Sequence, residues 1–407
     1  MTALMSLAVG CLIIFSVAAT AEPYRPGHDD EILETVATGG GGLSSELQLI
    51  ERLVARNPKN VDIVSNTVAT MIRLGSERND PYFYGRAEAL LVPWWTKPYP
   101  PAAILPLRAA ILQHQHAFQP ALADLTVFLA THPENASARL AQATIFQVVG
   151  EFAKARAACE ELPAAVEPLI AMVCVEWAES LTSDPRRAIA RIQNRLNLPR
   201  PYSRSALGYA WSALGDMGRR RGRQDDAAKF FAKALAQNPT DSFALVSLAD
   251  IFIEDDQPER TLDLLADVPD SDAITVRRAI SNRLARRTAK QVAEPTNGKL
   301  GASQIDAIAA SFAAATARKT NVHQREEAMF ELSIRDQPRT AVALAKANWT
   351  FQRETVDLRL LIRAGIAAAD EEALLMARNW LRTSRFFDRV SVQLLADHKN
   401  ANLRGVE

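Results

Sequence analysis

Residues 211–239 read WSALGDMGRRRGRQDDAAKFFAKALAQNP. Two apolar stripes at helical spacing lie on either side of the run Arg219–Arg223, and a proline ends the second stripe. Small residues in the stripes let two helix backbones approach, and large residues fill the space between successive pairs. The pattern is carried by Trp211, Leu214, Gly215, Ala227, Phe231, Ala234 and Pro239. This stretch therefore predicts a pair of antiparallel helices.

The spacing resembles that of the 34-residue tetratricopeptide repeat (TPR). A helix pair of this kind does not bury its own apolar face, so it stacks on further copies in a solenoid. The same register is recognisable at 102–135, 136–169 and 242–270, and in degenerate form at 322–355 and 356–385. The resemblance implies an all-α, TPR-like α-solenoid after an N-terminal signal peptide, with one elongated, curved body.

The domain organisation follows from this register. We expect a signal peptide at 1–21, a flexible lead at 22–42 that ends in four glycines, degenerate TPR-like helices at 43–101, and TPR repeats at 102–270. Atypical helices with a linker follow at 271–321, and degenerate TPR-like repeats with a cap at 322–407.

The N-terminus predicts the compartment. An uncharged apolar run over 3–19 precedes Ala19-Thr20-Ala21, which fits a signal-peptidase site, so we expect cleavage after Ala21 and a periplasmic protein. No Lys or Arg precedes the run, which leaves an uncleaved anchor as an alternative. No other segment approaches about 18 apolar residues, so no membrane span is expected in the mature chain.

The charge balance and the lack of catalytic motifs argue against nucleic-acid binding and against enzyme activity. The chain has 47 Lys plus Arg and 47 Asp plus Glu, so no overall field draws it to nucleic acid. Phosphate-binding loops, Gly-x-Ser-x-Gly elbows and His-Glu-x-x-His helices are absent from the sequence. We expect no enzyme activity, no cofactor and no metal. The resemblance implies instead a scaffold or adaptor for an envelope or secreted protein.

Two cysteines remain after the signal. The repeat register places Cys159 late in the second helix of one repeat and Cys174 early in the first helix of the next. Such helices pack together, so the Cα atoms could approach within the ~4.4–6.8 Å that a disulfide needs. Export permits the bond. The alternative is two buried free thiols.

The resemblance also implies a binding groove, because the first helix of each TPR lines the concave side of the solenoid. Its groove positions correspond here to Thr144, Gln147, Tyr209, Asp216, Arg219, Phe243 and Asp250, among others. This mixed surface suits an extended peptide or a partner's helix. Asp216 and Asp250 stand where carboxylate-clamp TPRs have Asn, and free carboxylates there would repel an acidic C-terminal tail.

Two basic clusters are candidates for an acidic partner. In the repeat at 208–241, Gly218 replaces the usual aromatic residue, which predicts loose packing and arginines of the run Arg219–Arg223 turned outward. The second cluster comprises Arg277, Arg278, Arg283, Arg286, Arg287 and Lys290. The alternative is a solvated surface balanced by nearby acids.

A different class of function is an accessory factor that binds carbohydrate through Trp94 and Trp95, or metal through His114 and His116. Packing of the indoles on neighbouring helices is the competing interpretation for the tryptophans. For the histidines it is exposure at a turn, because side chains at i and i+2 of a helix diverge by about 200°.

Overall fold

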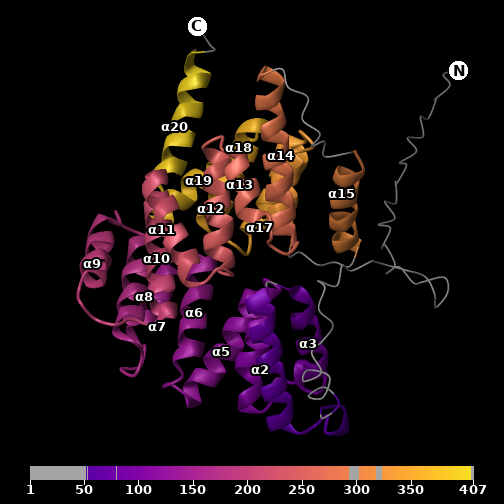
Figure 1. The fold of residues 1–407 in the computed structure, drawn as a ribbon, viewed down its shortest axis with the longest axis vertical. Helices are drawn as coiled ribbons and strands as arrows, with labels where there is room; N and C mark the ends of the chain where they lie inside the picture. Colours follow the sequence, from indigo (N-terminus) through magenta and orange to yellow (C-terminus); the bar gives the residue numbers. More distant parts are fainter. Residues whose placement is uncertain (1–51, 53, 79, 293–301, 318–322, 405–407) are drawn as a thin grey trace, which may run out of the picture.

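In the computed structural model, helices joined by turns make up residues 52, 54–78, 80–292, 302–317 and 323–404, and no strand occurs within these ranges (Figure 1). The all-α, solenoid prediction is confirmed. The expected signal peptide (1–21) and lead (22–42) lie outside the described residues.

The helices, in chain order, are α2 (Val61–Arg78), α3 (Pro81–Trp95), the short 3-10 helix η1 (Ala102–Ile104), α4 (Leu105–His114), α5 (Phe118–Thr131), α6 (Ala136–Val148), α7 (Phe152–Glu160), α8 (Pro168–Ser180), α9 (Arg186–Leu196), α10 (Arg204–Arg220), α11 (Gln224–Gln237), α12 (Ser242–Glu254), α13 (Pro258–Leu265), α14 (Asp272–Val292), α15 (Ala302–Ala317), α16 (Gln324–Ser333), α17 (Pro338–Trp349), α18 (Thr355–Ala368), α19 (Glu371–Ser384) and α20 (Arg389–Arg404).

The first helices of several pairs begin at a capping residue. Asn135, Ser203 and Asp241 precede α6, α10 and α12, and each side chain accepts a hydrogen bond from the backbone N–H three residues on. Each cap satisfies one of the N–H groups that a helix start leaves without a partner. These local signals fix where these three helix pairs begin.

The even-numbered helices form one continuous layer. Each contacts the next even-numbered helix, from α2 to α4 and onward to α20, and the odd-numbered helices other than α15 pack against their even-numbered neighbours. This is the order in which TPR-like pairs stack, because the apolar face of each pair is buried by its neighbours. The α8–α9 pair fills residues 168–196, where no repeat was recognised in the sequence.

The expected elongated body is wrong, because the C-terminal helices fold back over the middle of the solenoid (Figure 1). The Arg353 N–H donates to the Val148 carbonyl at 2.8 Å, and the Phe387 N–H donates to the Leu181 carbonyl at 2.7 Å. Leu181 shares one hydrophobic cluster with side chains of α17, α18 and α19. The concave side is therefore partly occupied by the chain's own C-terminal part.

The turn after α10 also departs from expectation. Arg219 and Arg220 are buried, and only Arg221 and Arg223 reach the surface. Gly218 does not loosen the pair, because a Cβ there would already lie 3.3 Å from the Ala227 Cβ. The missing aromatic ring is thus replaced by closer contact between α10 and α11.

The signature glycine of this repeat allows a direct test. A Cβ at Gly215 would lie 2.6–2.7 Å from ring atoms of Phe231, which is fully buried, so Gly215→Ala should lower the free energy of unfolding by about 1–2 kcal/mol. Gly208→Ala in the same helix meets only the Gln237 Cβ at 3.5 Å and should raise it by about 0.5–1 kcal/mol. Urea denaturation of both variants checks this, and a gain of stability in each would contradict it.

Candidate binding pocket

The seven residues expected to line the groove all border one pocket of about 390 Å³. Thr144 and Gln147 come from α6, and the others come from α10 and α12, so three members of the even-numbered layer build one wall. Thr144 is exposed and lies at the rim. The concave surface has therefore become a pocket that is partly open to solvent rather than a continuous groove.

Three aromatic side chains from α8, α10 and α12 form a cluster on one wall of the pocket. Trp177 of α8 lies 5.5 Å from Tyr209 and 5.7 Å from Phe243 between ring centroids. Burial raises the pKa of Tyr209, so its hydroxyl stays neutral at any ordinary pH. Rings of this kind offer large contact area at little cost in conformational entropy. The site is suited to an apolar or aromatic group.

The C-terminal part supplies the opposite wall. Arg325, Arg353, Glu354, Thr355, Val356 and Phe386 line the pocket from that side. The Arg353 guanidinium lies 4.9 Å from the Trp380 ring centroid, and its Nε donates to the Trp349 carbonyl at 3.3 Å. It forms no ion pair with a carboxylate within the described ranges, so Arg353 can meet an incoming anion.

Asp216 and Asp250 are not free carboxylates, which removes the reason to expect repulsion of an acidic tail. Asp216 accepts from the Trp177 indole N–H at 2.8 Å and from Arg220 Nε at 2.9 Å. Arg277 donates to both oxygens of Asp250, at 2.7 and 3.1 Å. Arg277, expected in a surface cluster, is buried in this ion pair. Both acids hold helices together.

Buried charges also join the two walls. Glu254 of α12 lies 3.3 Å from Arg219, 3.5 Å from Arg359 and 3.1 Å from Arg363 of α18. Burial alone would raise the pKa of Glu254, but the three arginines lower it to about 2. Buried pairs of this kind add little net stability compared with apolar packing. We expect them to fix which helices meet.

Arg325 anchors the loop that leads into α18. It donates to Asp357 at 2.6 and 2.7 Å and to Glu354 at 2.5 Å. Burial would raise the pKa of Glu354, but the Arg325 charge and hydrogen bond lower it, so the carboxylate stays ionised. The segment from 352 to 357, which covers the end of the loop and the first turn of α18, is therefore held in place at the pocket edge.

Sequence reasoning missed the pocket residues from α8 and from the C-terminal part. Trp177 stands 34 residues before Trp211, which is one repeat length and could have revealed the α8–α9 pair. Arg353 and Phe386 carried no such signal, because their place depends on the chain folding back.

Trp94 and Trp95 do not form an exposed platform. Trp94 is 5% exposed, and the backbone carbonyls of both residues accept hydrogen bonds from Arg108 Nη1 at 3.0 and 2.8 Å. Arg108 is in turn paired with Asp124 at 2.6 Å. Trp94 thus packs in the N-terminal core, where glycan would not reach its face.

His114 and His116 are neither exposed nor arranged as a metal site. His114 stacks on Tyr84 with 3.8 Å between ring centroids, and His116 stacks on Phe118 at 5.5 Å. Among the residues that the structure describes, no group of three or more His, Cys, Asp or Glu could hold a metal ion. Both rings serve as packing groups.

These histidines predict a pH dependence of stability. Burial and the charge of His323 lower the pKa of His114 to about 4, and burial with Arg325 lowers that of His116 to about 4. Because the unfolded value is about 6.5, protonation favours the unfolded chain. The contribution of each histidine to stability is full above pH 6.5 and should fall by about 3 kcal/mol as the pH drops towards 4.

The measurement is urea denaturation at pH 7 and pH 4.5, on the wild type and on His114→Gln/His116→Asn. Asn suits the positive φ of 56° at His116. The double variant should lose less stability on acidification. An equal loss in both proteins would exclude the histidines as the cause.

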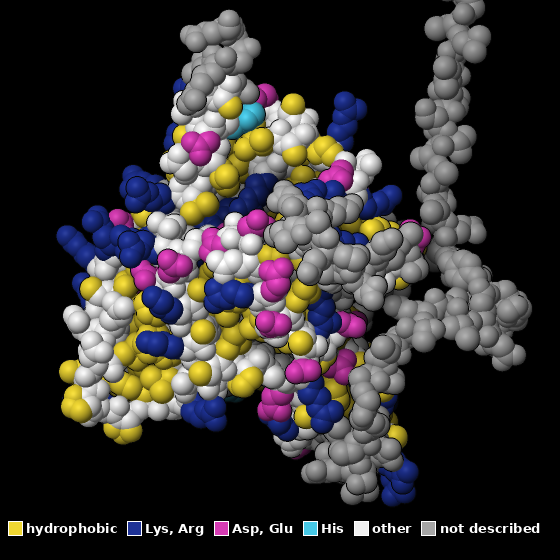
Figure 2. Space-filling view, turned by 45° about the horizontal axis from the view of Figure 1, so that its top comes forward, with side chains coloured by type: hydrophobic (Ala, Val, Ile, Leu, Met, Phe, Trp, Pro, Cys, Tyr) yellow, Lys and Arg dark blue, Asp and Glu magenta, His cyan; other side chains and the backbone are white. Residues whose placement is uncertain are grey.

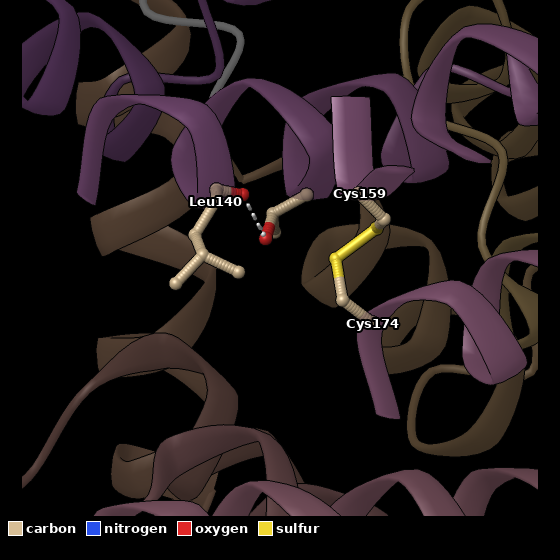
Figure 3. The surroundings of a disulfide bond; sticks show 4 residues. Leu140, Cys159 and Cys174 are labelled. Carbon is tan, nitrogen blue, oxygen red and sulfur yellow. Dashed lines mark hydrogen bonds between the residues drawn. A yellow bond between two sulfur atoms is a disulfide. The ribbon is translucent and has the colours of Figure 1, made fainter. Parts of the chain in front are cut away.

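Cys159 and Cys174 form a disulfide between α7 and the α8 that follows it (Figure 3). The Cα atoms are 5.5 Å apart, and both residues are buried. Nearby on α6, the Thr144 hydroxyl donates to the Leu140 carbonyl at 3.0 Å. The bond therefore links the repeat that carries Thr144 to the one that carries Trp177, and braces this wall of the pocket.

Comparisons with known proteins add little to what the structure shows of the fold. No family model matches the chain, and no curated protein matches it. A tetratricopeptide repeat protein from Parabacteroides merdae ATCC 43184 is similar, with 15% identity and a TM-score of 0.30 over 74% of this chain and 98% of that one. The human IFIT1 dimer with PPP-AAAA has 13% identity and a TM-score of 0.37 over 88% of each chain. These scores are low, so the solenoid assignment rests on the stacked helix pairs.

Within the described ranges, no helix is both long and apolar enough to span a membrane.

Proposed function

We propose that this chain is a non-catalytic periplasmic scaffold or adaptor that binds an envelope or secreted protein. The observation that carries the proposal is that all seven groove residues border one pocket with aromatic walls. A protein partner would insert an apolar or aromatic side chain between Trp177, Tyr209 and Phe243, as buried anchors do at protein interfaces.

Two observations support the periplasm as the compartment. A disulfide such as that between Cys159 and Cys174 forms and persists in an oxidising compartment. The apolar N-terminal run with its Ala-Thr-Ala site is typical of an exported chain. Stacked helix pairs are an architecture that mostly holds partners.

The size of the pocket limits what part of a partner can enter it. A partner's whole helix does not fit in about 390 Å³, whereas one or two side chains do. Arg353 at the edge could pair with a carboxylate of the same segment, since its guanidinium lacks an acidic partner in the described part of the chain.

The test blocks the pocket without disturbing the core. Thr144→Trp places a large side chain at the exposed rim, and Val127→Trp makes a matched change at an exposed position of α5. A photo-crosslinker at Phe243 should capture a periplasmic protein in the wild type and in Val127→Trp, and fail in Thr144→Trp. Capture that Thr144→Trp leaves unchanged would refute binding in the pocket.

A further inference from the structure

Three chain segments far apart in sequence meet at one edge of the solenoid. The turn after α8 lies against the segment before α20, where the Phe387 N–H donates to the Leu181 carbonyl. The turn after α10 joins them, because Arg221 Nε lies 3.4 Å from Asp184 and a Cβ at Gly222 would lie 3.6 Å from Val390. These contacts bring 181–187, 220–223 and 385–390 together.

Six arginines gather on this edge, which we call the basic rim: Arg186, Arg187, Arg221, Arg223, Arg385 and Arg389. Figure 2 shows basic side chains concentrated on the left side of the molecule, where α9 and the start of α20 lie in Figure 1. Asp184 pairs with Arg186 and Arg221, and Asp226 pairs with Arg223. Arg187, Arg385 and Arg389 are exposed and form no ion pair within the described ranges. The rim therefore keeps an excess of positive charge.

We propose that the basic rim binds an acidic segment of a protein partner. All six cations are arginines, whose planar guanidinium matches the two oxygens of a carboxylate better than a lysine does. Two rim arginines already pair with carboxylates of their own chain through one oxygen each, with Arg186 Nε 2.9 Å from Asp184 and Arg223 Nε 3.0 Å from Asp226. The three unpaired arginines offer the same chemistry to another chain.

The observations favour an acidic peptide over an anionic lipid surface. A protein that rests on a membrane usually inserts apolar side chains beside its basic ones. At this rim Phe386 is buried in the core and Phe387 is half-buried, with its backbone bonded to Leu181. One aliphatic side chain, Val392 of α20, is exposed near the arginines, but no aromatic side chain in the segments 181–187, 220–223 and 385–390 is exposed to act as a wedge. The rim segments adjoin the pocket, because Leu181 and Phe386 line it, but none of the six rim arginines does, so binding at the rim and binding in the pocket can be tested separately.

The test uses the purified full chain and a fluorescein-labelled poly-glutamate peptide, followed by fluorescence anisotropy at low and moderate salt. The rim variant is Arg187→Gln/Arg385→Asn/Arg389→Gln, with Asn chosen for the positive φ of 56° at Arg385. The control is Arg56→Gln/Arg287→Gln/Arg339→Gln, which removes the same charge from exposed arginines elsewhere. Circular dichroism checks that both variants fold.

We expect the rim variant to bind about tenfold more weakly than the wild type, because three charge contacts of modest strength are lost, and the control to stay within about twofold. Affinity should fall as salt is added. Equal losses in both variants would reduce the effect to net charge and overturn the proposal. So would binding to phosphatidylserine vesicles without binding to poly-glutamate, which would identify a lipid surface.

Discussion

Replacing Asp388 with alanine is expected to lower the free energy of unfolding by about 3–5 kcal/mol, because it leaves a buried arginine without its partner. Arg359 is 1% exposed and donates to both oxygens of Asp388, at 3.0 and 2.8 Å. The same carboxylate accepts from the Ser391 N–H and hydroxyl at the start of α20. One substitution therefore removes an ion pair and a helix cap.

Urea denaturation measures the loss, and hydrogen exchange locates it. Exchange should accelerate first in α18 and α20, which Asp388 ties together. The matched control is Asp397→Ala on α20, an exposed carboxylate whose one hydrogen bond within the described residues comes from Gln393, and it should cost less than about 0.5 kcal/mol. Similar losses in the two variants would show that Arg359 does not depend on Asp388.

Gly150→Ala should destabilise the protein by about 3 kcal/mol, for two separate reasons. Gly150 has a φ of 81°, which alanine adopts only with strain. A Cβ there would also overlap the indole of Trp380, lying 2.8 Å from its Cζ2. The indole has little freedom to retreat, since Trp349 packs edge-on to it at 5.6 Å and Arg353 covers its face.

Gly222→Ala separates the two reasons. Its φ of 73° imposes the same strain, but its Cβ would meet only Val390 at the ordinary distance of 3.6 Å. We expect a loss of about 1 kcal/mol there, measured by the same urea titration. If Gly150→Ala lowered the free energy of unfolding by no more than Gly222→Ala does, the contact between Gly150 and Trp380 would not hold the C-terminal helices in place.

Local pattern was enough to predict the helices and much of one pocket wall. The spacing from Trp211 to Pro239 defined a helix pair, and its register carried Tyr209, Asp216 and Phe243 onto one face. The same register placed Cys159 and Cys174 on adjacent helices, which the structure joins by a disulfide. These features depend on residues within one or two repeats of each other, so a single sequence contains them.

The fold-back of the C-terminal helices was not predictable in this way. The Arg359 guanidinium donates to the Arg219 carbonyl, 140 residues away in sequence, and Arg363 pairs with Glu254 across 109 residues. No periodic pattern encodes such pairings. The arginine run at 219–223 was misread for this reason. Asp216 stands four residues before Arg220 and was a visible partner, whereas Ser180, which accepts from Arg220 at 2.6 Å through its carbonyl, was not.

The fold-back between Val148 and Arg353 has an evolutionary consequence. An open array tolerates gain or loss of a repeat, because each unit contacts only its neighbours. Here the loop before α18 has to lie next to the end of α6, where Arg353 bonds to Val148. Deletion of one intervening helix pair would rotate the C-terminal helices away from this contact. The contact therefore forms with only one number of intervening helix pairs. We expect chains of this architecture to vary in loop length and surface residues, while the number of repeats between α6 and α18 stays constant.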